Sequence, residues 1–242
     1  MGTTRKIGLA RTLSKRGLCS RTQAFILVRA GRVLVNRVVR RDPEFPVRHT
    51  DDLRVDGEPL RAPERTYLMM NKSRGLVTTA SDERSRSTVY SLLPPGLPWV
   101  APVGRLDKAS EGLLLFTNDS QWAAQITSPE SSMEKTYRVQ IGVVADQALL
   151  DKLIEGVTVR RERLKAVRAS IVRTGKRNSW IEIVLDEGRN RQIRRMLNAQ
   201  GVEVLRLIRV AIGPLRLGDL PKGAVRSLTA DEKKALDRCL GS

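Results

Sequence analysis

The stretch GRLDKASEGLLLFTND, residues 104–119, is the most informative part of this 242-residue chain. It places one carboxylate, Asp107, two residues after Arg105 and shortly before the apolar run 113–116. That run is much shorter than the roughly 20 residues of a membrane helix and has the length of a fully buried strand. We therefore expect Asp107 to lie on a rigid element at the entrance to a buried strand, and we select it as the candidate catalytic residue. The alternative for such an aspartate is a turn cap or a partner of Arg105.

The charge of the chain indicates a polyanionic partner. It has 44 basic and 26 acidic residues, a formal net charge of +18, and residues 1–41 contain eleven Lys or Arg and no Asp or Glu. Clustered cations replace the counterions of a phosphate backbone, so we expect nucleic-acid binding, with an anionic membrane surface as the alternative. Phe25 is the only aromatic residue in the basic segment, which favours nucleic acid over a membrane anchor.

Several classes of protein are disfavoured by what the sequence lacks. No stretch is long and apolar enough for a membrane helix, and the N-terminus leads into no signal-peptide core, so we expect a cytoplasmic protein without a membrane partner. The two cysteines, Cys19 and Cys239, have neither disulfide nor metal spacing. A single histidine, His49, argues against histidine catalysis and histidine metal sites, and no glycine-rich ATP-binding loop occurs. We therefore predict aspartate chemistry with no cofactor and no metal.

The N-terminal part of the chain predicts two helices followed by a small sheet. A short helix should end at Gly17, and residues 20–23 have the spacing of a capping box that opens a second helix, which should end at Gly31. Residues 32–39 alternate and are rich in β-branched side chains, which favours a strand, a turn and a strand, with residues 52–57 closing the unit.

A charged stretch with two prolines and little apolar content follows at 57–66 and indicates a linker. We place a first domain at residues 1–60, the linker at 61–66 and a second domain at 67–242. Strands and helices of the second domain mix without regular alternation, which favours the α+β class. The expected elements of this domain are strands at 67–70 and 136–141, helices at 146–155 and 191–200, and a hairpin that turns at 175–178.

Four other segments accompany residues 104–119 along the chain: NKSRG at 71–75, EKTY at 134–137, EGRNRQIRRM at 187–196 and LIRVAIG at 207–213. Together the five segments resemble the motifs of the pseudouridine synthases, in the branch of the ribosomal small-subunit enzyme and its large-subunit relatives. The N-terminal unit resembles the S4-type RNA-binding module. The resemblance covers most of the chain and implies a catalytic domain with a long, mostly antiparallel sheet and an active-site cleft across its middle.

The resemblance implies roles for particular residues. Asp107 matches the catalytic nucleophile, and whether it attacks ribose C1′, attacks base C6 or acts first as a base stays open. Arg194 matches the basic residue that pairs with it, and Tyr137 matches the tyrosine that stacks on the target uracil. Leu207 matches an apolar residue that packs against the base, and Arg105 is suited to hold open the gap that the uridine leaves in its stack.

Further basic residues are expected to contact RNA. Lys72 and Arg74 would line the RNA path, with Gly75 allowing close approach, although Ser73 stands where the family commonly has proline. Arg195 is expected to point away from the cleft and to contact phosphate. The remaining expected RNA contacts are Lys135 and Arg191 in the second domain and Arg11, Lys15, Arg16, Arg21 and Arg29 in the first.

We therefore expect a monomeric enzyme that isomerises a specific uridine of ribosomal RNA, either free or in a ribosome-assembly intermediate. The S4-type module and the form of the segment 187–196 favour 23S-type over 16S RNA. One alternative is a non-catalytic RNA-binding assembly factor, which the joint presence of Asp107, Tyr137 and Arg194 disfavours. Another is a metal-dependent nuclease, which needs several carboxylates at one site, whereas Asp107 and Glu111 are the only close pair in the motif.

Overall fold

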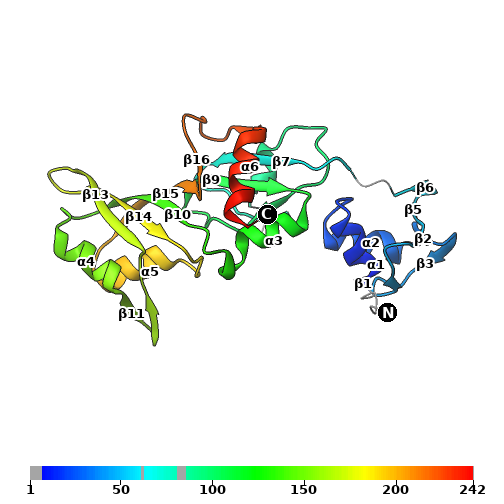
Figure 1. Ribbon diagram of the computed structural model, residues 1–242, viewed down its shortest axis with the longest axis horizontal. Helices are drawn as coiled ribbons and strands as arrows, with labels where there is room; N and C mark the ends of the chain where they lie inside the picture. The colour runs from blue at the N-terminus through cyan, green and yellow to red at the C-terminus, as the bar shows by residue number, and fades with distance from the viewer. Residues whose placement is uncertain (1–6, 61–62, 81–85, 242) are drawn as a thin grey trace. The chain divides into compact units, whose positions relative to one another are not determined.

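The computed structural model describes residues 7–60, 63–80 and 86–241 (Figure 1). The chain forms two compact units: one comprises the residues up to Tyr67 together with 94–101 and 116–120, and the other comprises the rest. Part of the predicted linker, residues 61–62, lies outside the described residues. Helices and strands are mixed along the chain, which confirms the α+β class.

The N-terminal unit has the predicted order of two helices and a small sheet. Helix α1 (Leu9–Lys15) precedes α2 (Arg21–Arg29), which begins with the predicted capping box: Ser20 Oγ accepts the Gln23 N–H and Gln23 Oε1 accepts the Ser20 N–H, each at 3.1 Å. The unit pairs β3, β2, β5 and β6 in that order, and β1 with β4. These strands are β1 (Ile7–Gly8), β2 (Val33–Val35), β3 (Val38–Arg40), β4 (Pro46–Val47), β5 (Leu53–Val55) and β6 (Glu58–Pro59).

The second unit is built on a nine-stranded sheet. The order along its main path is β13-β14-β10-β15-β9-β7-β17, while β16 pairs with β15 and β8 with β9. The β15–β9 pair is parallel and most others are antiparallel, which confirms the expected mixed sheet. The strands are β7 (Tyr67–Lys72), β8 (Ala101–Val103), β9 (Glu111–Thr117), β10 (Lys135–Ile141), β13 (Arg168–Thr174), β14 (Ser179–Leu185), β15 (Val204–Ile212), β16 (Leu215–Arg216) and β17 (Val225–Ser227), with a separate hairpin of β11 (Val157–Val159) and β12 (Glu162–Leu164).

The helices confirm the predictions at 146–155 and 191–200. Helix α4 begins at Asp146, whose carboxylate accepts the Leu149 N–H at 2.9 Å, and α5 buries Ile193 and Met196 in the core of the sheet. Helices α3 and α6 have no counterpart among the predicted elements. The helical elements of this part are η1 (Val89–Leu92), α3 (Ser120–Thr127), η2 (Pro129–Ser131), α4 (Gln147–Glu155), α5 (Gln192–Ala199) and α6 (Ala230–Cys239). Among the described residues, no helix has the length and apolar character required to span a membrane.

Strand β9 is buried at every position, as the apolar run predicts. Its parallel pairing with β15 brings Gly112 against the backbone of Arg209: a Cβ atom on Gly112 would lie 2.2 Å from the Arg209 carbonyl oxygen. The φ angle of Gly112 is also +101°, a conformation that L side chains rarely adopt. Gly112 therefore permits the contact between the two strands that support the candidate site.

Replacing Gly112 by Ala should lower the free energy of unfolding by about 3 kcal/mol or more, because the new methyl group meets backbone and the residue keeps a positive φ. Urea unfolding followed by circular dichroism measures this loss. Gly188→Ala is the matched control, since a Cβ at Gly188 meets no atom within 4 Å; we expect a change within about 0.5 kcal/mol. Equal effects of the two substitutions would contradict the close β9–β15 packing.

Candidate active site

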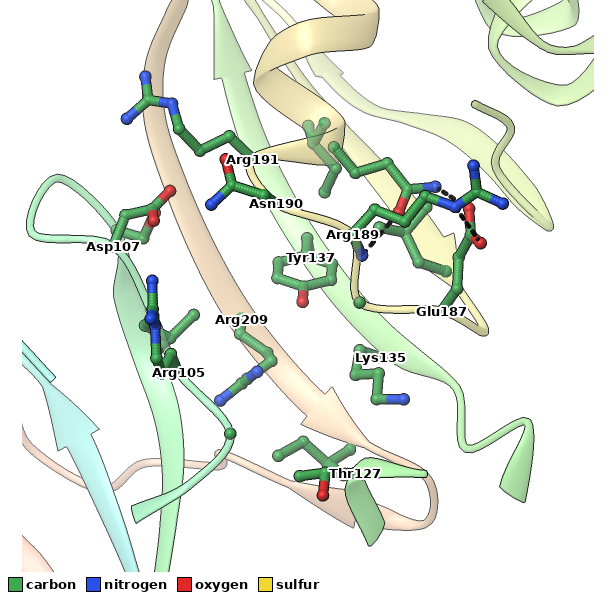
Figure 2. Close-up of a pocket in the computed structure, with 18 of the residues that line it drawn as sticks. Arg105, Asp107, Thr127, Lys135, Tyr137, Glu187, Arg189, Asn190, Arg191 and Arg209 are labelled. Carbon is green, nitrogen blue, oxygen red and sulfur yellow. Dashed lines mark hydrogen bonds and ion pairs between the residues drawn. The ribbon is translucent and has the colours of Figure 1, made fainter. Parts of the chain in front are cut away.

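A cavity of about 790 Å³ opens in the second unit (Figure 2). Its wall is formed by the loop between β8 and β9, strands β10 and β15, the region around the end of α3, and the segment that leads into α5. This volume is typical of a site for a small molecule or a single nucleotide. Of the residues expected at a catalytic site, the cavity is lined by Arg105, Asp107, Lys135, Tyr137, Arg191, Arg194 and Leu207.

Asp107 lies in the loop between β8 and β9, before the buried strand. The loop is fixed by hydrogen bonds to its backbone. The hydroxyl of Thr78 donates to the Leu106 carbonyl at 2.7 Å and accepts the Leu106 N–H at 3.3 Å. The Gly75 N–H donates to the Lys108 carbonyl at 2.8 Å. Backbone partners on both sides of Asp107 therefore hold the loop in place.

Lys72, at the end of β7, is the strongest anchor of this loop. Its side chain is fully buried, and its ammonium group donates to the carbonyls of Asp107 (3.1 Å), Ser110 (2.8 Å) and Ser73 (3.2 Å). Burial lowers the pKa of Lys72 to about 8, against the opposing effect of the Asp107 and Glu111 carboxylates. A fully buried ammonium cannot reach an RNA phosphate, so the structure does not support the predicted RNA contact at Lys72.

Arg194 acts on the same loop from α5. Its Nη2 donates to the Ala109 carbonyl at 3.1 Å and its Nη1 to the Val204 carbonyl at 3.3 Å. Burial lowers the pKa of Arg194, the charge of Arg191 lowers it further, and the charge of Asp107 opposes both. Within the described residues no hydrogen bond or ion pair joins Arg194 to Asp107. Arg194 interacts with Asp107 through its charge and through the backbone at Ala109.

Strands β10 and β15 form the floor of the cavity. Tyr137 of β10 pairs in register with Arg209 of β15, and Leu207 lies two residues before Arg209, on the same face of the strand. In the view of Figure 2, Tyr137 lies at the centre of the cavity, between Asp107 on one side and Lys135 on the other. An aromatic ring, an apolar side chain and cations therefore surround the space that Asp107 faces.

Arg209 is absent from the predicted site residues although it lines the cavity. It is only 6% exposed; its Nε donates to the Leu113 carbonyl at 2.7 Å, while its Nη2 is buried without a hydrogen-bond partner among the described residues. A buried donor without an acceptor costs about 1 to 3 kcal/mol. The sequence signal for Arg209 was its spacing of two from Leu207, which puts both side chains on one face of a strand.

Cations also surround the mouth of the cavity. In Figure 2, Asp107 lies between the side chains of Arg105 and Arg191, both of which are exposed. Burial lowers the pKa of Lys135, the charge of Arg209 lowers it further, and the charge of Asp186 opposes both. The cavity is thus suited to a polyanionic ligand.

Glu111, the acidic residue close to Asp107 in the motif, does not line the cavity. Its buried carboxylate is bonded to Arg206 at 3.0 Å and to Lys222 at 2.8 Å. Burial alone would raise the pKa of Glu111, but these two partners outweigh it and hold the pKa below its usual value. In the ranges that the structure describes, no group of three His, Cys, Asp or Glu side chains is arranged to hold a metal ion.

Two other predicted RNA contacts of the second domain lie outside the cavity wall. Arg74 is exposed on the loop that follows β7. Arg195 is half-buried, and its Nη2 is bonded to the Glu162 carboxylate, so it is engaged within the protein. Arg195 is therefore a weaker phosphate candidate than the sequence suggested.

The predicted RNA contacts of the N-terminal unit lie on or next to its two helices. Arg16 is half-buried at the end of α1 and donates to the His49 carbonyl at 3.1 Å. The guanidinium of Arg29 lies over the Phe25 ring, 5.4 Å from its centre. The exposed members of this set are Arg11, Lys15, Arg21 and Arg29.

Comparison with known protein families defines the class. Residues 66–199 match the family model described as RNA pseudouridylate synthase, and residues 7–53 match the S4 domain. The first match spans more than half of the chain, so the chain belongs to the RNA pseudouridylate synthase family. It is an RNA pseudouridine synthase, an isomerase, with an N-terminal S4 domain, as the sequence motifs indicated.

Individual relatives extend this likeness over nearly the whole chain. It is 33% identical over 230 residues to "Ribosomal large subunit pseudouridine synthase B" of Bacillus subtilis (strain 168), a match that covers 94% of each chain. It is 34% identical over 238 residues to an uncharacterized RNA pseudouridine synthase of Aquifex aeolicus (strain VF5), covering 98% of this chain and 96% of that one. Among solved structures, a crystal structure of pseudouridylate synthase matches with a TM-score of 0.68 and 29% identity, covering 95% of this chain and 99% of the other.

Replacing Lys72 by Met should change how stability depends on pH. The pKa of Lys72 is about 8 in the folded protein and has its ordinary value of 10.5 in the unfolded chain. Between these pH values the unfolded chain binds more protons, so this residue makes the free energy of unfolding rise with pH, by on the order of 3 kcal/mol in total. Urea unfolding from pH 7 to about 10.5 should show the rise in the wild type and a flatter curve for Lys72→Met. If the free energy of unfolding depended on pH in the same way in both proteins, this would contradict a buried Lys72 with a lowered pKa.

Proposed function

We propose that this enzyme converts a specific uridine of ribosomal RNA to pseudouridine, and that large-subunit RNA, free or in an assembly intermediate, is its substrate. The observation that supports catalysis is the Asp107 carboxylate in a cavity lined by Tyr137 and Leu207, on a loop that buried Lys72 ties to the sheet. The 33% identity to the Bacillus subtilis protein named for the large subunit supports the choice of RNA. The exposed basic side chains of the S4 domain fit a structured RNA.

The proposed reaction needs neither an oxidant nor an energy source. The bond between uracil N1 and ribose C1′ breaks, the base turns, and C5 forms a bond to the same C1′. N1 gains a proton and C5 loses one, so substrate and product are isomers. We assign the essential carboxylate to Asp107, whether it attacks C1′, attacks C6 or first removes a proton, since each route requires one ionised carboxylate in a site shielded from water.

The floor of the cavity suits an extruded uracil. Stacking on the Tyr137 ring would contribute about 1 to 3 kcal/mol, and Leu207, which is almost fully buried, would exclude water beside the base. Extrusion from a stack costs a few kcal/mol, and exposed Arg105 at the mouth of the cavity is assigned to the gap that remains in the RNA. The nucleotide would then lie between Tyr137 and Asp107.

Two of the buried cations are assigned different roles. Arg194 is a positioning residue, because its bond to the Ala109 carbonyl acts on Asp107 through the backbone. Arg209 is assigned to the nucleotide itself, because the residue lines the cavity and its Nη2 has no hydrogen-bond partner among the described residues. Lys135 adds a second positive charge to the same floor.

Asp107→Asn should abolish pseudouridine formation, because the amide keeps the size of the side chain and removes its negative charge. The measurement is carbodiimide-adduct mapping by primer extension on unmodified 23S and 16S transcripts, with excess EDTA present and no nucleotide added. We expect one new stop with the wild type, in the 23S transcript, and none with Asp107→Asn. A stop of equal strength with the variant would contradict the role of Asp107, and loss of the wild-type stop in EDTA would contradict metal-free chemistry.

Arg209→Met should slow pseudouridine formation about 10- to 100-fold, the worth of one charge-assisted hydrogen bond. Its free energy of unfolding should fall by no more than about 2 kcal/mol, because the substitution removes an unsatisfied donor along with the Arg209–Leu113 hydrogen bond. Arg216→Met on neighbouring β16, where the arginine is exposed, is the matched control and should change neither quantity. Severe destabilisation by Arg209→Met with unchanged turnover in the folded fraction would assign Arg209 a structural role only.

A further inference from the structure

The hairpin of β11 and β12 turns through two adjacent arginines. Val159 pairs with Glu162, so Arg160 and Arg161 alone form the turn. Their φ angles are +50° and +70°, which puts both residues in the left-handed region. Two-residue hairpin turns with two positive φ angles favour Asn-Gly, because few other residues adopt this conformation without strain.

The side chains of Arg160 and Arg161 have no polar partner in the described structure. Arg160 and Arg161 are both exposed and make no hydrogen bond or ion pair with any described residue. The neighbouring Arg163, in contrast, donates to the Glu155 carbonyl at 2.7 Å. Two arginines thus occupy strained positions without a polar contact to the described part of the chain, and backbone strain of this kind is characteristic of functional sites.

The base of the hairpin is rigid. Val157 and Leu164 are buried in the same apolar core as Met196 and Leu197 of α5, and this fixes the hairpin on that helix. Figure 1 shows the β11 hairpin projecting from this part of the molecule, beyond α4 and α5. The turn is therefore a charged tip on a firmly attached arm.

The hairpin is also joined to the wall of the active site. Glu162, the first residue after the turn, accepts a hydrogen bond from Arg189 at 2.8 Å and is bonded to Arg195. Arg189 and Arg191 line the cavity that contains Asp107. Through Arg189, the wall of the cavity is therefore joined to the base of the hairpin that presents Arg160 and Arg161.

We propose that the β11–β12 hairpin is an RNA-binding arm, in which Arg160 and Arg161 contact backbone phosphates of the substrate outside the target nucleotide. The inference rests on the proposed function, because the RNA that enters the cavity is the polyanion that must pass the arginines at its mouth. Guanidinium groups match the geometry of phosphate oxygens and remain charged at any working pH. Such contacts hold the RNA in register without reading its sequence.

The test variant, Arg160→Asn with Arg161→Gly, replaces both turn residues by the pair that adopts this backbone conformation without strain. We expect the Tm to rise by a few degrees, because the strain is relieved. Affinity for an unmodified 23S transcript should fall about tenfold at low salt, and the slope of log affinity against log salt should become shallower by about 2. In assays of pseudouridine formation the weaker RNA binding should raise KM and leave kcat unchanged. A hairpin of purely structural value would show none of these RNA effects.

Two control variants separate charge from backbone strain and from position. Arg160→Lys with Arg161→Lys keeps both charges and both strained residues, and its salt slope should stay within about 0.5 of the wild type. Lys176→Gln with Arg177→Gln removes two charges from another exposed turn of the same unit, between β13 and β14, and should also leave the slope unchanged.

Two results would overturn the proposal that the β11–β12 hairpin binds RNA. One is wild-type affinity and salt slope in the Asn-Gly variant while the wild type forms pseudouridine, which leaves the proposed function intact. The other is an equal loss in the Lys176 and Arg177 variant, which would indicate general charge attraction. Failure of the proposed function is distinguishable, because the wild type itself would then create no pseudouridine, whatever its variants bind.

Discussion

The active site depends on one buried ammonium group. Lys72 ends β7 and donates to three backbone carbonyls, those of Ser73, Asp107 and Ser110, so the loop that carries Asp107 is attached to the central sheet. The strand that follows, β9, is buried throughout and pairs with β15 at Gly112. A catalytic carboxylate, the role proposed for Asp107, must be held to within about half an ångström, and these contacts support a residue that lies on a loop.

The same site contains several cationic groups that are removed from water. Lys72 and Arg194 have pKa values lowered by burial, and Arg209 carries a buried donor without a described partner. Burial of such groups reduces stability unless a ligand or another group compensates, and proteins retain them mainly at functional sites. The strained arginines of the β11–β12 hairpin follow the same rule at the surface, where Asn-Gly would give a more stable turn.

Sequence patterns predicted those features that depend on neighbouring residues. The capping box at 20–23, the buried strand after Asp107 and the helix at 191–200 all follow from local patterns, and the structure confirms them. Helix α6 could also have been predicted, because Thr229 and Glu232 form a capping box. The burial of Lys72 could not, because it depends on the packing of β7 beneath a loop about 35 residues further along the chain. The parallel β9–β15 pairing that brings Arg209 to the cavity likewise requires the sheet topology.

Amide hydrogen exchange measured by NMR tests most directly whether Lys72 holds the catalytic loop. The informative amides are those of Gly75, which donates to the Lys108 carbonyl, and Ser110, which donates to the Asp107 carbonyl. In the wild type both should be protected nearly as well as the amides of β10, and in Lys72→Met both should exchange about 100-fold faster while β10 stays protected. Rapid exchange of Gly75 and Ser110 in the wild type, or unchanged protection in the variant, would contradict a loop fixed by the buried lysine.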